Sequence, residues 1–137
     1  MQAMCSLDVQ GPSAMELAEA FIDDSRESPA TAAAAKTMLR AALAARDRVD
    51  ELLVGEVRHW DLGRMALVAR NILRLAGWEL LEGRTGHGVV IDHALRLAEE
   101  FSTTDAVRFI NGVLDAVARR LRERSAPQGQ AAASGQD

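Results

Sequence analysis

The chain has 137 residues, of which 48% are hydrophobic and 26% are charged, and its formal net charge is -4 at pH 7. This is the composition of a single globular domain, with no apolar run approaching the roughly 18 residues of a membrane span and no secretory signal at its start, so we expect a cytoplasmic protein without membrane attachment. The acidic balance excludes nucleic-acid binding through a general basic surplus, and any such site must therefore be local.

The first two predicted helices are short. One covers Met1 to Asp8 and ends before the helix-breaking Gly-Pro pair at positions 11–12. It is only about two turns long, so it is not stable unless it packs against a core. The other is capped by Ser13 and runs to about Asp24. Its apolar stripe consists of Met15, Ala18, Phe21 and Ile22.

A long third helix is predicted to begin at Ser28-Pro29, with the serine as N-cap and the proline in the first helical position, and to end near Gly55. Arg40, Asp47 and Asp50 lie off its apolar seam and indicate a solvated face. The seam recurs every three or four residues and consists of Ala35, Met38, Ala42, Ala45, Val49 and Leu52.

The fourth and fifth helices are separated by a glycine-rich loop. Trp60 lies in the connection that precedes the fourth helix, which is predicted from about Asp61 to Glu82. One face of this helix carries Leu62, Met65, Ala69, Ile72, Ala76 and Leu80. The fifth helix, from about Val89 to Phe101, is amphipathic and is expected to bury Val90, Ala94, Leu97 and Phe101.

Ser102 and Asp105 match a capping box and predict the start of a sixth helix, which runs to about Arg124. Gly112 inside this helix costs about 1 kcal/mol against alanine, which predicts that its missing side chain permits a close helix crossing. The inward positions are Val107, Ile110, Val113, Leu114, Val117 and Leu121. Residues 126–137 are rich in Ala, Gln, Gly and Ser and are predicted to be a disordered tail.

These elements predict an all-α fold. No segment alternates in the manner of a strand, and six helices with short connections favour one bundle or two small bundles within residues 1–125.

Catalysis and metal binding are not expected. The sequence has no HExxH, GxSxG, GxGxxG or P-loop pattern, and His59, His87 and His93 are too widely spaced to form a helical ligand pair. Cys5 is the only cysteine, so an internal disulfide or a CxxC site cannot form, and we expect it to be a small buried hydrophobic residue. The predicted protein is therefore not an enzyme and has no cofactor.

Three segments, in this order and spacing, resemble the carboxy-terminal half of the NusB family. They are ILRLAGWELL (Ile72 to Leu81), VVIDHALRLAEEF (Val89 to Phe101) and FINGVLDAV (Phe109 to Val117). The first eleven residues, MQAMCSLDVQG, look like the second half of that family's first helix, and Trp60 stands where the family has a tryptophan. The resemblance implies two packed three-helix bundles and a role in processive antitermination during ribosomal RNA synthesis. The implied partners are a boxA-type RNA, ribosomal protein NusE and the transcription elongation complex.

The amino terminus departs from the family pattern. The family carries an arginine-rich segment just before the point at which this chain begins, and that segment supplies much of the grip on RNA. Met1 falls inside the expected first helix, so we interpret the true start as lying upstream; the alternative is that the phosphate contacts have been lost. Cys5 replaces a common aromatic residue, and a lost stacking surface would cost roughly 1–3 kcal/mol per base.

The resemblance implies an RNA site at the start of the sixth helix, formed by Asp105, Arg108 and Phe109 and joined by Gln2. Backbone N–H groups at a helix start bind phosphate, Arg108 adds charge, and Phe109 can stack on a base. The alternative is that Phe109 is a core residue and that Arg108 is merely solvated.

For the protein partner, the candidates implied by the resemblance are Arg70, Arg74 and Glu79. Ala69 occupies a position where the family often has an acidic residue. Each of the three candidates could instead be an ordinary surface or intramolecular ion-pair residue. The alternative for the whole chain is a helical protein-interaction module or homodimer that keeps the fold without binding RNA, which the net charge and the missing arginine segment favour.

Overall fold

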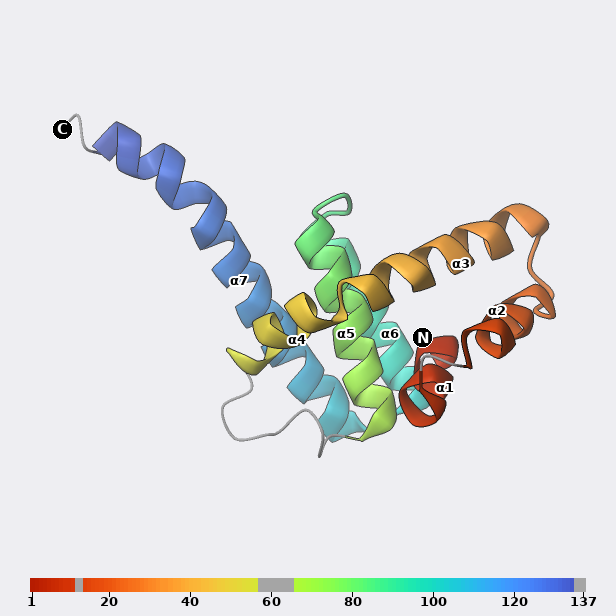
Figure 1. The fold of residues 1–137 in the computed structure, drawn as a ribbon. Helices are drawn as coiled ribbons and strands as arrows, with labels where there is room; N and C mark the ends of the chain where they lie inside the picture. The colour runs from red at the N-terminus through yellow and green to blue at the C-terminus, as the bar shows by residue number, and fades with distance from the viewer. Residues whose placement is uncertain (12–13, 57–65, 135–137) are drawn as a thin grey trace.

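The computed structural model describes residues 1–11, 14–56 and 66–134, with side chains as far as Arg124, and all regular structure in these ranges is helical. The predicted all-α class is therefore confirmed. The helices are α1 (Gln2–Gln10), α2 (Met15–Asp23), α3 (Pro29–Ala44), α4 (Arg46–Val54), α5 (Leu67–Glu82), α6 (His87–Phe101) and α7 (Thr104–Ser134) (Figure 1). No helix in these ranges combines the length and hydropathy needed to traverse a lipid bilayer.

Two hydrophobic cores hold the helices together, and α5 contributes to both. The larger core is formed by the four helices α4, α5, α6 and α7. It includes Leu53, Leu73 and Leu114, none of which is accessible to solvent. The smaller core joins α1, α2 and α3, and Trp78 of α5 packs against both cores. Burial of each large aliphatic side chain contributes about 1.5–3 kcal/mol to stability. This arrangement agrees with the expectation of two packed helical units, with α4 as an additional short helix.

The long helix predicted between Pro29 and Gly55 is wrong, because the chain turns at Ala45. This residue has φ -93° and ψ 2°, so α3 ends before it and α4 begins after it. The turn lets Leu39 of α3 enter the smaller core while Val49 of α4 enters the larger one. Periodicity did not reveal the break because the apolar spacing continues across it.

The fourth predicted helix starts later than expected. Ala66 has φ -55° and ψ 137°, which is not helical, so α5 begins at Leu67. Trp60 and the predicted start at Asp61, with Leu62 and Met65, lie outside the described residues. The remaining face is confirmed, because Ala69, Ile72, Ala76 and Leu80 are all buried.

The helix starts confirm one predicted cap and shift another. Ser28 Oγ accepts a hydrogen bond from the Thr31 N–H at 3.2 Å, as the N-cap prediction requires. At α7 the cap is Thr103, whose hydroxyl accepts from the Ala106 N–H at 3.1 Å, whereas Ser102 ends α6. The predicted capping box of Ser102 and Asp105 is therefore wrong: the cap is one residue later, and Ala106, three residues after Thr103, has no side chain that could complete a box. Ser13 lies outside the described residues.

The close helix crossing predicted at Gly112 is found at Gly77 instead. A Cβ atom at Gly77 would lie 3.0 Å from Val49 Cγ1, so this glycine brings α5 against α4. A Cβ atom at Gly112 would meet no atom within 4 Å, and Gly112 is exposed on α7. The prediction for Gly112 is wrong because the inward face of α7 is formed by its neighbours Ile110 and Val113.

Two aromatic residues predicted to face inward are exposed. Phe21 of α2 is 54% accessible and Phe101 at the end of α6 is 38% accessible. The inward face of α7 is confirmed, since its predicted residues are buried or pack against the larger core. α7 extends to Ser134, beyond the predicted end near Arg124; the predicted disorder of residues 126–137 stays a prediction.

Candidate binding surfaces

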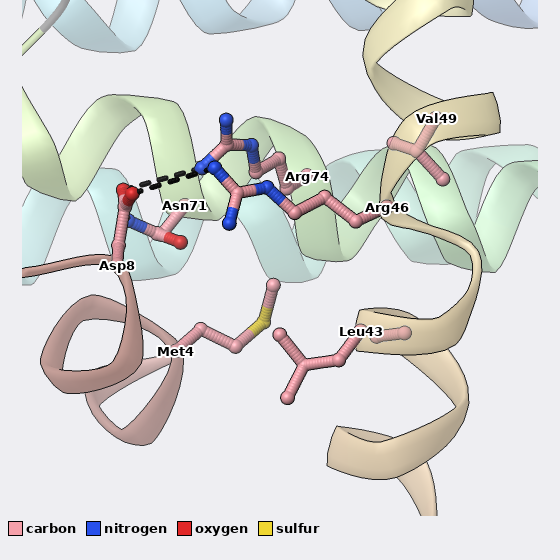
Figure 2. A pocket seen from close by; sticks show the side chains of 8 residues that line it. Met4, Asp8, Leu43, Arg46, Val49, Asn71 and Arg74 are labelled. Atoms are coloured by element: carbon pink, nitrogen blue, oxygen red, sulfur yellow. Dashed lines mark hydrogen bonds and ion pairs between the residues drawn. The ribbon is translucent and has the colours of Figure 1, made fainter. Parts of the chain in front are cut away.

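A carboxylate on α1 organises the polar contacts between the two cores. Asp8, whose side chain is only 7% exposed, lies 2.7 Å from Arg70 Nη2 and 3.2 Å from Arg74 Nη1. Asn71 donates a hydrogen bond to the same Asp8 oxygen at 2.8 Å. Figure 2 shows Asp8 facing Arg74, Asn71 and Arg46. These contacts fasten α1 to α5 and α4.

The electrostatics of Asp8 follow from this geometry. Burial alone would raise the pKa of the Asp8 carboxyl, but hydrogen bonds from Asn71 and Arg70, together with the charges of Arg74 and Arg70, lower the pKa below its ordinary value of 3.8. The carboxylate is therefore held in its charged form. Its negative charge compensates the positive charges of the arginines around it.

Arg74 links this network to α4. It donates two hydrogen bonds to Asp50, at 2.8 and 3.0 Å, in the bidentate geometry that arginine favours. Asp50 was predicted to lie on a solvated face, and this is wrong for Asp50, although Asp47 is exposed as expected. The periodicity of one helix does not show which polar residues meet a second helix.

The pocket beside this network is too small to hold a ligand. Its volume is about 10 Å³, near the minimum that one water molecule requires, and Met4, Leu43 and Val49 form its apolar wall (Figure 2). The network is thus a structural one, which confirms the intramolecular ion-pair alternative for Arg70 and Arg74; their partner Asp8 was not predicted. The available signal was the only charged residue of the first helix, an acid, together with arginines spaced i, i+4 on another helix.

The three predicted partner-binding residues have different environments. Arg70 and Arg74 are engaged by Asp8, and their side chains are 16% and 9% exposed. Glu79 is half-buried and lines an open groove of about 560 Å³ between α3 and the carboxy-terminal end of α5, together with Met38, Trp78 and Glu82. Burial raises the pKa of the Glu79 carboxyl, although the charges of His93 and the amino terminus act in the opposite direction.

Three of the four predicted RNA-binding residues lie together on the first two turns of α7. Asp105 and Arg108 are exposed. Phe109 is half-buried and packs against the larger core. The partial burial of Phe109 is compatible with both interpretations, a core contact and an RNA contact.

Gln2 lies elsewhere. It is exposed at the start of α1 and lines a groove of about 180 Å³ with Phe21 and Met38, from α2 and α3. α7 packs instead on α4, α5 and α6. The structure therefore does not place Gln2 in the group formed by Asp105, Arg108 and Phe109.

Cysteine and histidine chemistry adds no further site in the described part of the chain. Cys5 is half-buried, not fully buried as expected, and burial raises the pKa of its thiol, which disfavours the reactive thiolate. His93 is exposed. Residues 1–11, 14–56 and 66–124 contain no group of three or more His, Cys, Asp or Glu side chains arranged to hold a metal ion.

Comparisons with known proteins agree with this architecture. The model of the NusB family matches residues 1–119. Transcription antitermination protein NusB of Geobacter sulfurreducens is 34% identical over 126 residues, which cover 90% of this chain and 91% of that protein. The NusB of Solibacter usitatus is 49% identical over 79 residues, and the matched stretch spans only 54% of its length. In the solved structures, T. maritima NusB superposes with a TM-score of 0.78 at 27% identity, covering 86% of this chain and 84% of that one.

Proposed function

Because this chain belongs to the NusB family, we propose that it acts in transcription antitermination as a binding protein that carries no catalytic centre. The observation that carries this proposal is the family match over residues 1–119, supported by the NusB of Geobacter sulfurreducens, which aligns over 91% of its length. In this proposal the partners are a boxA-type RNA and ribosomal protein NusE, within the transcription elongation complex.

The start of α7 is the proposed RNA site. Arg108 is exposed and can pair with a phosphate, while Phe109 presents a ring of the kind that stacks on unpaired bases. Asp105 lies one turn before Phe109 and can accept hydrogen bonds from base amino groups. Gln2 remains a proposed contact only for an RNA long enough to reach α1.

We expect Phe109→Ala to weaken binding of a boxA RNA by about fivefold or more, since a base-stacking contact contributes roughly 1–3 kcal/mol. A gel shift with the full chain measures this. Leu121→Ala is the matched control, because Leu121 is also half-buried, packs on the same core and lies on α7 away from the first turns. Equal affinity of the Phe109→Ala variant and the parent would contradict the RNA site.

For the protein partner, we propose that Glu79 is the principal contact, in the groove that it lines with Trp78 and Glu82. The two carboxylates suit a cationic segment of the partner, and Trp78 adds an aromatic wall. Arg70 and Arg74 stay in the proposed surface only as secondary contacts, because the partner would have to share them with Asp8.

We expect Glu79→Gln to reduce capture of NusE severalfold, because it removes a charge while keeping the shape of the side chain. Glu99→Gln, on the exposed face of α6, is the control. Burial disfavours the ionised form of Glu79, so the substitution should not lower the melting temperature. Unchanged capture with an intact fold would remove Glu79 from the partner surface.

A second function is favoured by the distribution of charge. Residues 1–56 contain ten acidic and five basic side chains, so the acidic excess lies on the first four helices. A protein-interaction module or homodimer that does not bind RNA fits this surface. Absence of binding to any RNA, together with a dimer in analytical ultracentrifugation, would favour this second function.

A further inference from the structure

The solvent face of α7 continues beyond the proposed RNA site. From Asp105 onward, exposed residues recur every three or four positions along one side of the helix. They are Asp105, Arg108, Gly112, Asp115, Arg119 and Arg122. In Figure 1, α7 runs from the base of the bundle past α4 and away from α1, α2 and α3.

Gly112 has no role in the packing of the described residues. It lies in the middle of a helix, where glycine is the least favourable residue apart from proline, yet a Cβ atom there would meet nothing within 4 Å. Gly77, by contrast, is required by the contact of α5 with α4. A glycine on an exposed helix face leaves the backbone bare, and this permits another chain to approach closely.

Arginines gather on α7 after this glycine. Residues 116–124 contain four arginines and a single acid, Glu123. Arg120 is directed to Glu56 at 3.4 Å, whereas Arg119 and Arg122 belong to the exposed face. Arg119 pairs with Asp115 at 2.9 Å, but both side chains are about 60% accessible, so the pair is solvated and exchangeable. Arginine binds phosphate in a bidentate manner.

We propose that RNA bound at the start of α7 continues along this face, with its sugar–phosphate backbone over Gly112 and its phosphates on Arg119 and Arg122. The proposal rests on the proposed function and extends it. At 1.5 Å per residue, Arg108 and Arg122 are about 21 Å apart along the helix. A stacked strand that rises about 3.4 Å per nucleotide along its axis needs about six nucleotides to cover that length.

The first test uses two RNAs and the double variant Arg119→Gln, Arg122→Gln in the full chain. One RNA is a short boxA oligonucleotide, and the other is the same RNA extended by about six nucleotides at each end. The variant should bind the extended RNA on the order of tenfold more weakly, and the dependence of log K on log salt should become shallower by about 1.4, or 0.7 for each lost phosphate contact. Its affinity for the short RNA should not change.

Arg96→Gln is the matched control, since Arg96 is also exposed and pairs with an aspartate four residues before it, Asp92. Failure of this proposal and failure of the proposed function are distinguishable. If the parent binds RNA but the double variant binds the extended RNA equally well, the extended track is excluded while the RNA site at the start of α7 stands. If the parent binds neither RNA, both proposals fall.

The second test is Gly112→Ala. The alanine should raise the melting temperature by about 4 °C through helix propensity, and it should weaken binding of the extended RNA several-fold because its Cβ atom blocks the approach. Gly88→Ala on α6 is the control, because Gly88 is an exposed helical glycine with nothing within 4 Å of a Cβ atom. A lower melting temperature for Gly112→Ala, or unchanged RNA affinity, would overturn the assignment.

Discussion

At the scale of single residues, Asp8 is the polar contact on which the joint between the two cores depends. It is almost completely buried and is bound by Arg70, Asn71 and Arg74 of α5. A buried carboxylate without these donors would be strongly destabilising, and the arginines without the carboxylate would be left with uncompensated charge. Removing either partner alone is therefore expected to destabilise the joint between the two cores.

We expect Asp8→Asn to lower the free energy of unfolding by about 3–5 kcal/mol at pH 7, because it removes one partner from a buried ion pair. Asp92→Asn, in an exposed i, i+4 pair with Arg96, is the control and should cost less than about 1 kcal/mol. Denaturant titration measures both variants.

The effect of Asp8 also depends on pH, with a sign set by its lowered pKa. A carboxyl whose pKa is lower in the folded state stabilises the fold above its unfolded value, here 3.8, and this contribution is lost as the pH falls through the folded value. The difference in stability between the parent and Asp8→Asn should therefore be constant near neutrality and shrink below about pH 4. A difference that grew on acidification would show that Asp8 is not held as a carboxylate.

At the scale of elements, the contact of α5 with α4 depends on the absence of a side chain at Gly77. We expect Gly77→Ala to destabilise the protein by about 1 kcal/mol, since overpacking against Val49 Cγ1 exceeds the gain in helix propensity. In a Val49→Ala background the same substitution should become neutral or stabilising. A double-mutant cycle in denaturant measures this coupling, and additive effects would contradict a contact between the two positions.

The elements also show what local patterns can and cannot predict. Proline at position 29 after Ser28, and the apolar spacing of α5 to α7, depend on neighbouring residues and were predictable. The turn at Ala45 was not, because alanine favours helix and the seam is unbroken across it. The turn places residues before and after it in two separate cores. This depends on tertiary packing, which local sequence patterns do not contain.

At the scale of the whole molecule, the arrangement as two packed units followed from family resemblance, whereas the contacts that join the units did not. Gly77 and Gly112 look alike in sequence, as glycines inside apolar helices, but one is buried against α4 and the other faces solvent. The candidate site shows the same limit. Asp105, Arg108 and Phe109 are neighbours in the chain and remain neighbours in space, while Gln2 depends on how α1 is placed.

The net charge of the molecule also has a different meaning once it is mapped on the fold. Residues 57–137 carry eleven basic and ten acidic side chains, so the half that contains α5 to α7 is almost balanced. The overall value of -4 therefore says little about the face of α7. Local charge is what a bound strand would experience, because screening in physiological salt limits interactions to about 8 Å.

The position of α5 has a consequence for synthesis on the ribosome. α1, α2 and α3 emerge first, but the wall that closes their core, with Leu75 and Trp78, and the arginines that neutralise Asp8 come from residues translated later. The ribosome adds about 5–20 residues per second, so the nascent amino-terminal helices spend seconds without α5. The amino-terminal helices therefore cannot complete this core before Leu67–Glu82 has left the exit tunnel.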